Sequence, residues 1–155
     1  EALEAHVGRE AVVVAPDLGA LRLARRYAKV LRLPLAVTHK VRRSGTEVEI
    51  ERVAGEVRGL RPVLVDDMIA TGGTIVAAAR ALVAAGARRD LVVAATHPVL
   101  TAGTVERLRQ AGLHRLFVTD TIAAPGPIDS SIVTQVSTAP LLASAVRRLT
   151  ARRSA

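Results

Sequence analysis

VLVDDMIATGGT, at residues 63–74, decides how the rest of this sequence is interpreted. Its apolar start is typical of a buried strand, which brings two adjacent carboxylates, Asp66 and Asp67, to the carboxyl end of that strand. The glycines that follow let backbone N–H groups approach an anion, and the start of the next helix favours negative charge. The carboxylates can accept hydrogen bonds from a vicinal diol. We therefore predict a sugar-phosphate site in which the anion contacts Thr71, Gly72, Gly73 and Thr74.

A turn with a simple helix cap is the alternative interpretation of residues 71–74. The two aspartates at the end of the preceding strand favour the sugar-phosphate interpretation, because an anion cradle near a diol acceptor matches both ends of such a ligand. The segment does not predict a Walker-type nucleotide loop, since no Gly-Lys-Ser or Gly-Lys-Thr follows.

Apolar β-branched runs alternate with helical patterns on both sides of this segment. The alternation predicts an α/β fold with a doubly wound, mostly parallel sheet flanked by helices, in a single domain over residues 1–155. Ligands of such sheets bind beyond the carboxyl ends of the strands. The polar residues 42–45 are expected to form a protruding flexible loop. Strands are expected at residues 11–15, 35–38, 46–53, 62–65, 91–95, 116–119 and 132–136, and helices at residues 18–31, 73–85, 105–111 and 141–149.

A second candidate loop, APDLGA at residues 15–20, also joins a strand to a helix. Gly19 and Ala20 are small enough to let the backbone approach a second anion, and Asp17 can hold Mg²⁺ through water. The alternative is a helix cap at Asp17, and the loop by itself favours that alternative.

A third candidate, HKVRRSG at residues 39–45, follows a short strand. Lys40 and Arg42 on a mobile loop can close over a polyphosphate and neutralise the charge that develops during transfer. A solvated basic loop is the alternative. His97, at the end of another strand, is weak evidence for a phosphate or metal site, and a histidine hydrogen-bonded at the rim of the sheet is equally consistent with its position.

The composition narrows the classes of partner. Aromatic residues make up 1% of the chain, so the stacking platforms of single-strand nucleic-acid binders are not expected. There is no cysteine, which excludes disulfides and thiolate metal sites. The formal net charge of +8 suits a polyphosphate substrate or nucleic acid, and equally an arginine-rich solvated surface. No apolar run approaches the ~20 residues that span a bilayer, and no signal peptide is visible. We expect a cytoplasmic protein without membrane or nucleic-acid partners.

The VLVDDMIATGGT segment resembles the phosphoribosyl-pyrophosphate loop of type I phosphoribosyltransferases. Around it, APDLGALRLARRYAKVL, HKVRR, AATHPVLTAGTVERL, VTDTI and STAPLLASAVRRL follow one another in a fixed order. Together these motifs are similar to the C-terminal half of ribose-phosphate pyrophosphokinases, and the likeness covers essentially the whole chain. The resemblance implies a phosphoribosyltransferase-like fold and a longer synthase whose N-terminal, ATP-binding half is absent from this sequence.

The resemblance implies transfer of pyrophosphate from ATP to the C1 hydroxyl of ribose 5-phosphate, which yields phosphoribosyl pyrophosphate and AMP. It assigns the ribose hydroxyls to Asp66 and Asp67 and the 5-phosphate to residues 71–74. Lys40 and Arg42 match the catalytic flexible loop of the family. The family's assemblies imply a homo-oligomer or a partner subunit. A pyrophosphate loop near Mg²⁺ corresponds to Asp17, Gly19 and Ala20.

Ala70 departs from the family pattern, in which an aspartate precedes TGGT, and it weakens one predicted contact to ribose. Two alternatives therefore stay open. One is a stand-alone phosphoribosyltransferase, because uracil phosphoribosyltransferases resemble the sequence at this position. The other is a non-catalytic regulatory subunit of a synthase. Lys40, Arg42 and the paired aspartates are retained, which favours the catalytic interpretation.

Overall fold

A computed structural model describes residues 2–44, 47–123, 126 and 129–151, without the side chains of residues 40–51. A seven-stranded sheet with the order β3-β2-β1-β4-β5-β6-β7 forms its centre. Neighbouring strands are parallel except β2 and β3, which form an antiparallel hairpin. The strands are β1 (Ala11–Ala15), β2 (Leu35–Ser44), β3 (Glu47–Ala54), β4 (Arg61–Ile69), β5 (Leu91–Pro98), β6 (Leu113–Thr119) and β7 (Val133–Val136).

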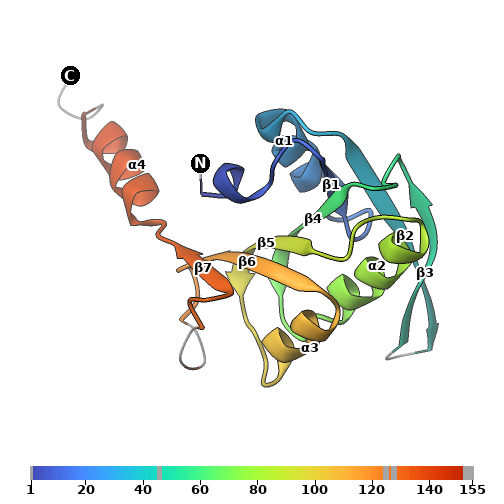
Figure 1. Cartoon of the computed structure of the whole chain (residues 1–155). Helices are drawn as coiled ribbons and strands as arrows, with labels where there is room; N and C mark the ends of the chain where they lie inside the picture. The colour runs from blue at the N-terminus through green and yellow to red at the C-terminus, as the bar shows by residue number, and fades with distance from the viewer. Residues whose placement is uncertain (1, 45–46, 124–125, 127–128, 152–155) are drawn as a thin grey trace.

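Helices cover both faces of the sheet, as Figure 1 shows. A short 3-10 helix, η1 (Glu4–His6), precedes β1, and the α-helices are α1 (Leu21–Leu31), α2 (Gly73–Ala84), α3 (Thr104–Gln110) and α4 (Ala139–Ala151). Helix α1 packs on one face, while α2 and α3 pack on the other. The predicted doubly wound, mostly parallel α/β fold is thereby confirmed.

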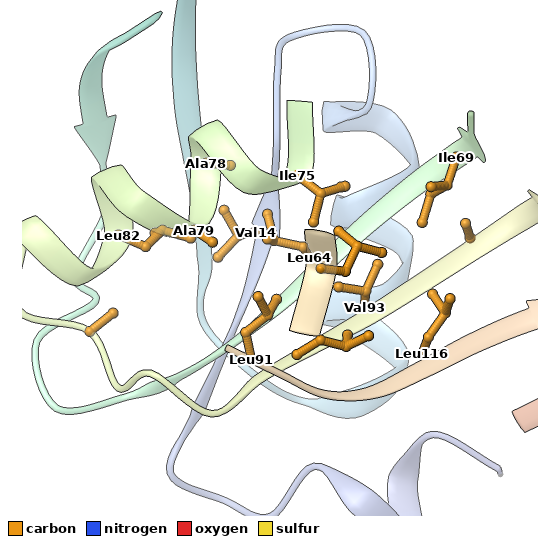
Figure 2. Close-up of a cluster of buried hydrophobic side chains, with 14 of the residues drawn as sticks. Val14, Leu64, Ile69, Ile75, Ala78, Ala79, Leu82, Leu91, Val93 and Leu116 are labelled. Carbon is orange, nitrogen blue, oxygen red and sulfur yellow. The ribbon is translucent and has the colours of Figure 1, made fainter. Parts of the chain in front are cut away.

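Successive residues of the central strands serve two separate cores, because side chains alternate across a sheet. Val13 and Val63 lie on the α1 side, in one cluster with Ala24. Val14 and Leu64 lie on the opposite side, packed with residues of α2 such as Ile75. Figure 2 shows this second core, in which Val14, Leu64 and Ile75 gather between the sheet and α2. Both faces of the strands are buried, which explains why they are continuous apolar runs.

Four strands, β2, β4, β5 and β6, are longer than the sequence pattern predicts, and β2 and β4 exceed their predicted lengths most. Strand β4 continues through both aspartates to Ile69, because β5 stays paired with it as far as Ile69 and Pro98. Strand β2 continues to Ser44, so the prediction that a loop begins at Arg42 is wrong: Arg42 pairs with Val48 of β3. Backbone pairing with the alternating segment that follows extends β2. Residues 45 and 46 lie outside the described part of the chain, and the flexibility of this segment stays a prediction.

Helix α4 has no buried residue and extends away from the sheet beyond β7 (Figure 1). Its start is held by Asp120, which accepts hydrogen bonds from Ser137 Oγ at 2.6 Å and from the backbone N–H of Thr138 at 2.8 Å. These bonds lower the pKa of Asp120 to about 2, the Ser137 bond contributing most. Among the described residues, no helix has the length and apolar character that crossing a bilayer requires.

Candidate active site

An open cleft lies where the carboxyl ends of β1 and β4 meet. The two strands are parallel neighbours, with Val13 beside Val63, so the loop after β1 and the end of β4 reach the same edge of the sheet. The volume of the cleft is about 660 Å³. It is lined by Asp17, Gly19, Ala20, Arg22, Leu23, Arg26, Asp66, Asp67 and Thr96.

The loop before α1 brings one carboxylate to this cleft. Oδ1 of Asp17 accepts a hydrogen bond from the backbone N–H of Ala20 at 3.1 Å. A Cβ atom at Gly19 would lie 3.1 Å from the same oxygen, so a larger residue would crowd the carboxylate. Asp17 therefore orders its own loop and also faces the cleft, as the ligand-binding prediction requires. The alternative, a helix cap at Asp17, is wrong, because α1 begins at Leu21 and its N-cap residue is Ala20.

The paired aspartates of β4 form the opposite part of the lining. Asp66 is half-buried and Asp67 is exposed. The pKa of Asp66 is raised to about 6, chiefly by burial and also by the nearby carboxylates of Asp67 and Asp17, against the lowering effect of a hydrogen bond from the Asp67 N–H. Three carboxylates on one cleft form an acceptor-rich surface. Such a surface favours hydroxyl donors and cations as ligands.

The predicted phosphate turn begins helix α2. Gly72 is the N-cap residue and has φ +76°, a left-handed conformation that glycine adopts without strain. It has no side chain that could cap the helix, and Oγ1 of Thr71 accepts only a long 3.4 Å bond from the N–H of Gly73. The turn can therefore accommodate an anion. Thr71, Gly72, Gly73 and Thr74 are not among the described residues that line the cleft.

The two predicted catalytic cations lie on β2, whose hairpin with β3 is visible in Figure 1. The backbone of Lys40 pairs with Ile50, and that of Arg42 with Val48. Their side chains lie outside the described part of the structure, so their catalytic role stays a prediction.

Three polar residues of the cleft were missed by the sequence analysis. Arg22 and Arg26 lie one turn apart on α1, and both line the cleft. Their i, i+4 spacing directly after a small-residue loop was the available signal. Thr96, at the end of β5, also lines it, whereas the neighbouring His97 has its Nδ1 2.9 Å from Oγ1 of Thr121. The structural alternative for His97, a hydrogen-bonded histidine at the rim of the sheet, is the one observed.

The carboxylates of the cleft fit a Mg²⁺ ion that binds together with substrate phosphates. Its carboxylates supply the oxygen ligands that Mg²⁺ prefers, but no three acidic or histidine side chains in the described residues form a metal cluster. Mg²⁺ commonly binds through one or two carboxylates together with substrate phosphates. The residues present fit that arrangement, with Asp17 as the predicted ligand.

Residues 3–114 match the family model described as the phosphoribosyl transferase domain. The chain belongs to this family. Among curated phosphoribosyl transferase relatives, a ribose-phosphate pyrophosphokinase of Streptomyces avermitilis is 45% identical over 139 residues, which are 88% of this chain and 43% of the relative. One from Caldanaerobacter subterraneus is 37% identical over 147 residues, 95% of this chain and 46% of the relative. The chain thus spans about half the length of these relatives.

Two solved structures share the fold of this phosphoribosyl transferase domain. A phosphoribosylpyrophosphate synthetase from Mycobacterium smegmatis has a TM-score of 0.75 and 36% identity, covering 93% of this chain and 46% of that one. The APRTase from Giardia lamblia, solved with 9-deazaadenine, has a TM-score of 0.54 at 20% identity, with 76% and 72% covered. The second similarity concerns the fold alone.

Proposed function

We propose that this chain is the ribose-5-phosphate-binding catalytic half of a ribose-phosphate pyrophosphokinase, residues 1–155 forming one domain of a longer, cytoplasmic and oligomeric synthase. The observation that carries the proposal is the likeness to named pyrophosphokinases over 88–95% of the chain. The cleft adds chemical support, because its carboxylates and arginines suit a ligand that is rich in both hydroxyl groups and phosphates.

We assign each group of the substrates to residues at or just beyond the carboxyl ends of β1 and β4. The 5-phosphate binds the turn at residues 71–74, where the N-terminus of α2 favours negative charge. Asp66 and Asp67 accept hydrogen bonds from the ribose hydroxyls. The pyrophosphoryl group lies between the Asp17 loop and the arginines of α1, which partly balance its charge.

The proposed reaction is attack of the C1 hydroxyl oxygen on the β-phosphorus of ATP. The bond from that phosphorus to the oxygen bridging it to the α-phosphorus breaks, AMP leaves, and the hydroxyl proton passes to solvent. The protein contributes mainly by positioning the two substrates and by stabilising charge. Lys40 and Arg42 are the residues proposed to stabilise the transition state. Mg²⁺, when bound near Asp17, neutralises phosphate charge.

Calorimetric titration of the chain with ribose 5-phosphate tests the site. We expect binding, and we expect Asp67→Ala to remove most of it. Glu10→Gln is a suitable control, because Glu10 is 85% exposed and is not among the residues lining the cleft. An Asp67→Ala variant with the affinity of the unmodified chain would contradict the site assignment.

A stand-alone phosphoribosyltransferase is the competing enzyme, and the matched family model supports it as a candidate. Titration with nucleobases in the presence of phosphoribosyl pyrophosphate separates the two functions. A base that binds only in that ternary mixture would favour the transferase. Ribose 5-phosphate binding without any such base dependence would favour the pyrophosphokinase half.

A further inference from the structure

The segment from β5 into α3 holds the back of the phosphate turn. Three successive backbone carbonyls, those of residues 69–71, accept hydrogen bonds from this segment. Ile69 O accepts the N–H of Leu100 at 3.0 Å, and Ala70 O accepts the N–H of Thr101 at 3.1 Å. The third, Thr71 O, accepts Nε of Arg107 at 3.1 Å. These bonds join residues 69–71, which run from the end of β4 to the first residue of the phosphate turn (residues 71–74), to a segment about thirty positions further along the chain.

Thr104 is the centre of this contact. Its side chain is 1% exposed, and its Oγ1 donates a 2.8 Å hydrogen bond to Ala70 O. Arg107 donates to the same Oγ1 through Nη2 at 3.1 Å, so one guanidinium joins Thr104 to the Thr71 carbonyl. A Cβ atom at Gly72 would lie 3.3 Å from Cγ2 of Thr104, which shows how closely α3 approaches the turn.

We propose that Thr104 and Arg107 are positioning residues, which orient the phosphate turn so that its N–H groups face the sugar phosphate. In a planar trans peptide the C=O of one residue and the N–H of the next point in opposite directions. Holding the carbonyls of Ala70 and Thr71 against α3 therefore directs the N–H groups of Thr71 and Gly72 away from α3. It also keeps two partially negative oxygens away from the anion. This inference rests on the proposed function.

Paired substitutions test the role of each side chain. Thr104→Val keeps the shape but removes the hydroxyl, and Thr104→Ser restores it. Arg107→Gln removes an exposed cation, and Arg109→Gln is its matched control, because Arg109 is on the same helix and bonds to Asp129 instead. The readouts are calorimetric affinity for ribose 5-phosphate, and the amide hydrogen exchange of residues 71–74 in the ligand-free chain.

We expect Thr104→Val and Arg107→Gln to bind ribose 5-phosphate about five- to tenfold more weakly, a change within the range of the net contribution of a hydrogen bond. Both should speed amide exchange in the turn, whereas Thr104→Ser and Arg109→Gln should stay within about twofold of the unmodified chain. Should Thr104→Val fail to fold, the exposed Arg107→Gln still decides the matter.

Unchanged affinity in Arg107→Gln would overturn the positioning role while leaving the proposed function intact. Weakened affinity in both the Arg107 and Arg109 variants would also overturn it, because the effect would then be one of net charge. Failure of the unmodified chain to bind ribose 5-phosphate is a different result, which would overturn the proposed function and this inference together.

Discussion

The backbone N–H of Asp67 donates a hydrogen bond of 2.9 Å to Oδ1 of Asp66 at the end of β4. This bond favours the ionised form of Asp66, yet burial and the neighbouring carboxylates outweigh it and raise the pKa to about 6 from an ordinary 3.8. The cleft thus contains a carboxyl group that holds its proton more tightly when the chain is folded than when it is unfolded. Its charge state is coupled to folding.

A falling stability between pH 4 and pH 6 follows from the raised pKa of Asp66. The folded state binds the proton more tightly, so the stabilisation is complete below the unfolded pKa and is lost as pH rises through about 6. We expect the free energy of unfolding to drop by the order of 1 kcal/mol over this range, because solvent screens a group that is only half-buried. Urea unfolding at several pH values measures it, and Asp66→Asn should abolish the drop.

The lowered pKa values of Asp90 and Asp120 have the opposite effect on the free energy of unfolding: it falls as pH decreases, and it does so at lower pH than the change due to Asp66. Burial tends to raise the pKa of Asp90, but hydrogen bonds from Arg88 and Arg61 outweigh it and lower the value to about 2, and that of Asp120 is also about 2. Their stabilisation is lost only as pH falls from about 4 towards 2. A drop between pH 4 and 6 that persists in Asp66→Asn would show that another group is responsible.

Arg22 and Arg26 should contribute to the binding of phosphate-rich ligands, because both line the cleft with Asp17. We expect Arg22→Ala and Arg26→Ala each to weaken binding of magnesium pyrophosphate by about three- to tenfold at low salt. The difference should shrink at about 0.5 M salt, where charges are screened over a few ångströms. Arg25→Ala is the control, since Arg25 is on the same helix but does not line the cleft. Equal losses in all three variants would indicate a general charge effect.

Gly112 should tolerate substitution far less well than Gly59, although both have positive φ. A Cβ atom at Gly112 would lie 2.2 Å from the backbone O of Arg89, whereas nothing lies within 4 Å of one at Gly59. We expect Gly59→Ala to cost about 1–2 kcal/mol of unfolding free energy, for the left-handed conformation alone. Gly112→Ala should cost clearly more, because the backbone must also move. Urea unfolding compares them, and equal costs would show that the chain relaxes freely around Gly112.

Leu64 and Leu142 provide a matched test of where the stability resides. Leu64 is fully buried between the sheet and α2, and Leu142 of α4 is 61% exposed. We expect Leu64→Ala to lower the free energy of unfolding by about 2–5 kcal/mol, and Leu142→Ala by less than about 0.5 kcal/mol. Chemical denaturation of both variants measures the difference. A large loss at Leu142 would mean that α4 is packed against something in solution.

The sequence analysis predicted the parallel sheet and its flanking helices correctly, because hydrophobic periodicity is local information. It underestimated the lengths of β2, β4, β5 and β6, and most of all those of β2 and β4. The extension of β4 past Asp66 depends on the pairing of Ile69 with Pro98, and that of β2 on the pairing of Arg42 with Val48. Strand length is decided by a partner strand, and no local pattern identifies that partner.

The sequence alone determined which groups the VLVDDMIATGGT segment offers, namely paired carboxylates before a glycine turn, and these groups lead to the prediction of a sugar-phosphate ligand. Only the tertiary structure decided what surrounds the segment. The order of the strands puts β1 next to β4, which brings Asp17 and the arginines of α1 to the aspartates. The same folding brings Thr104 and Arg107 against the back of the turn. These contacts join positions more than thirty residues apart, and hydrogen bonding between non-consecutive elements is what brings them together.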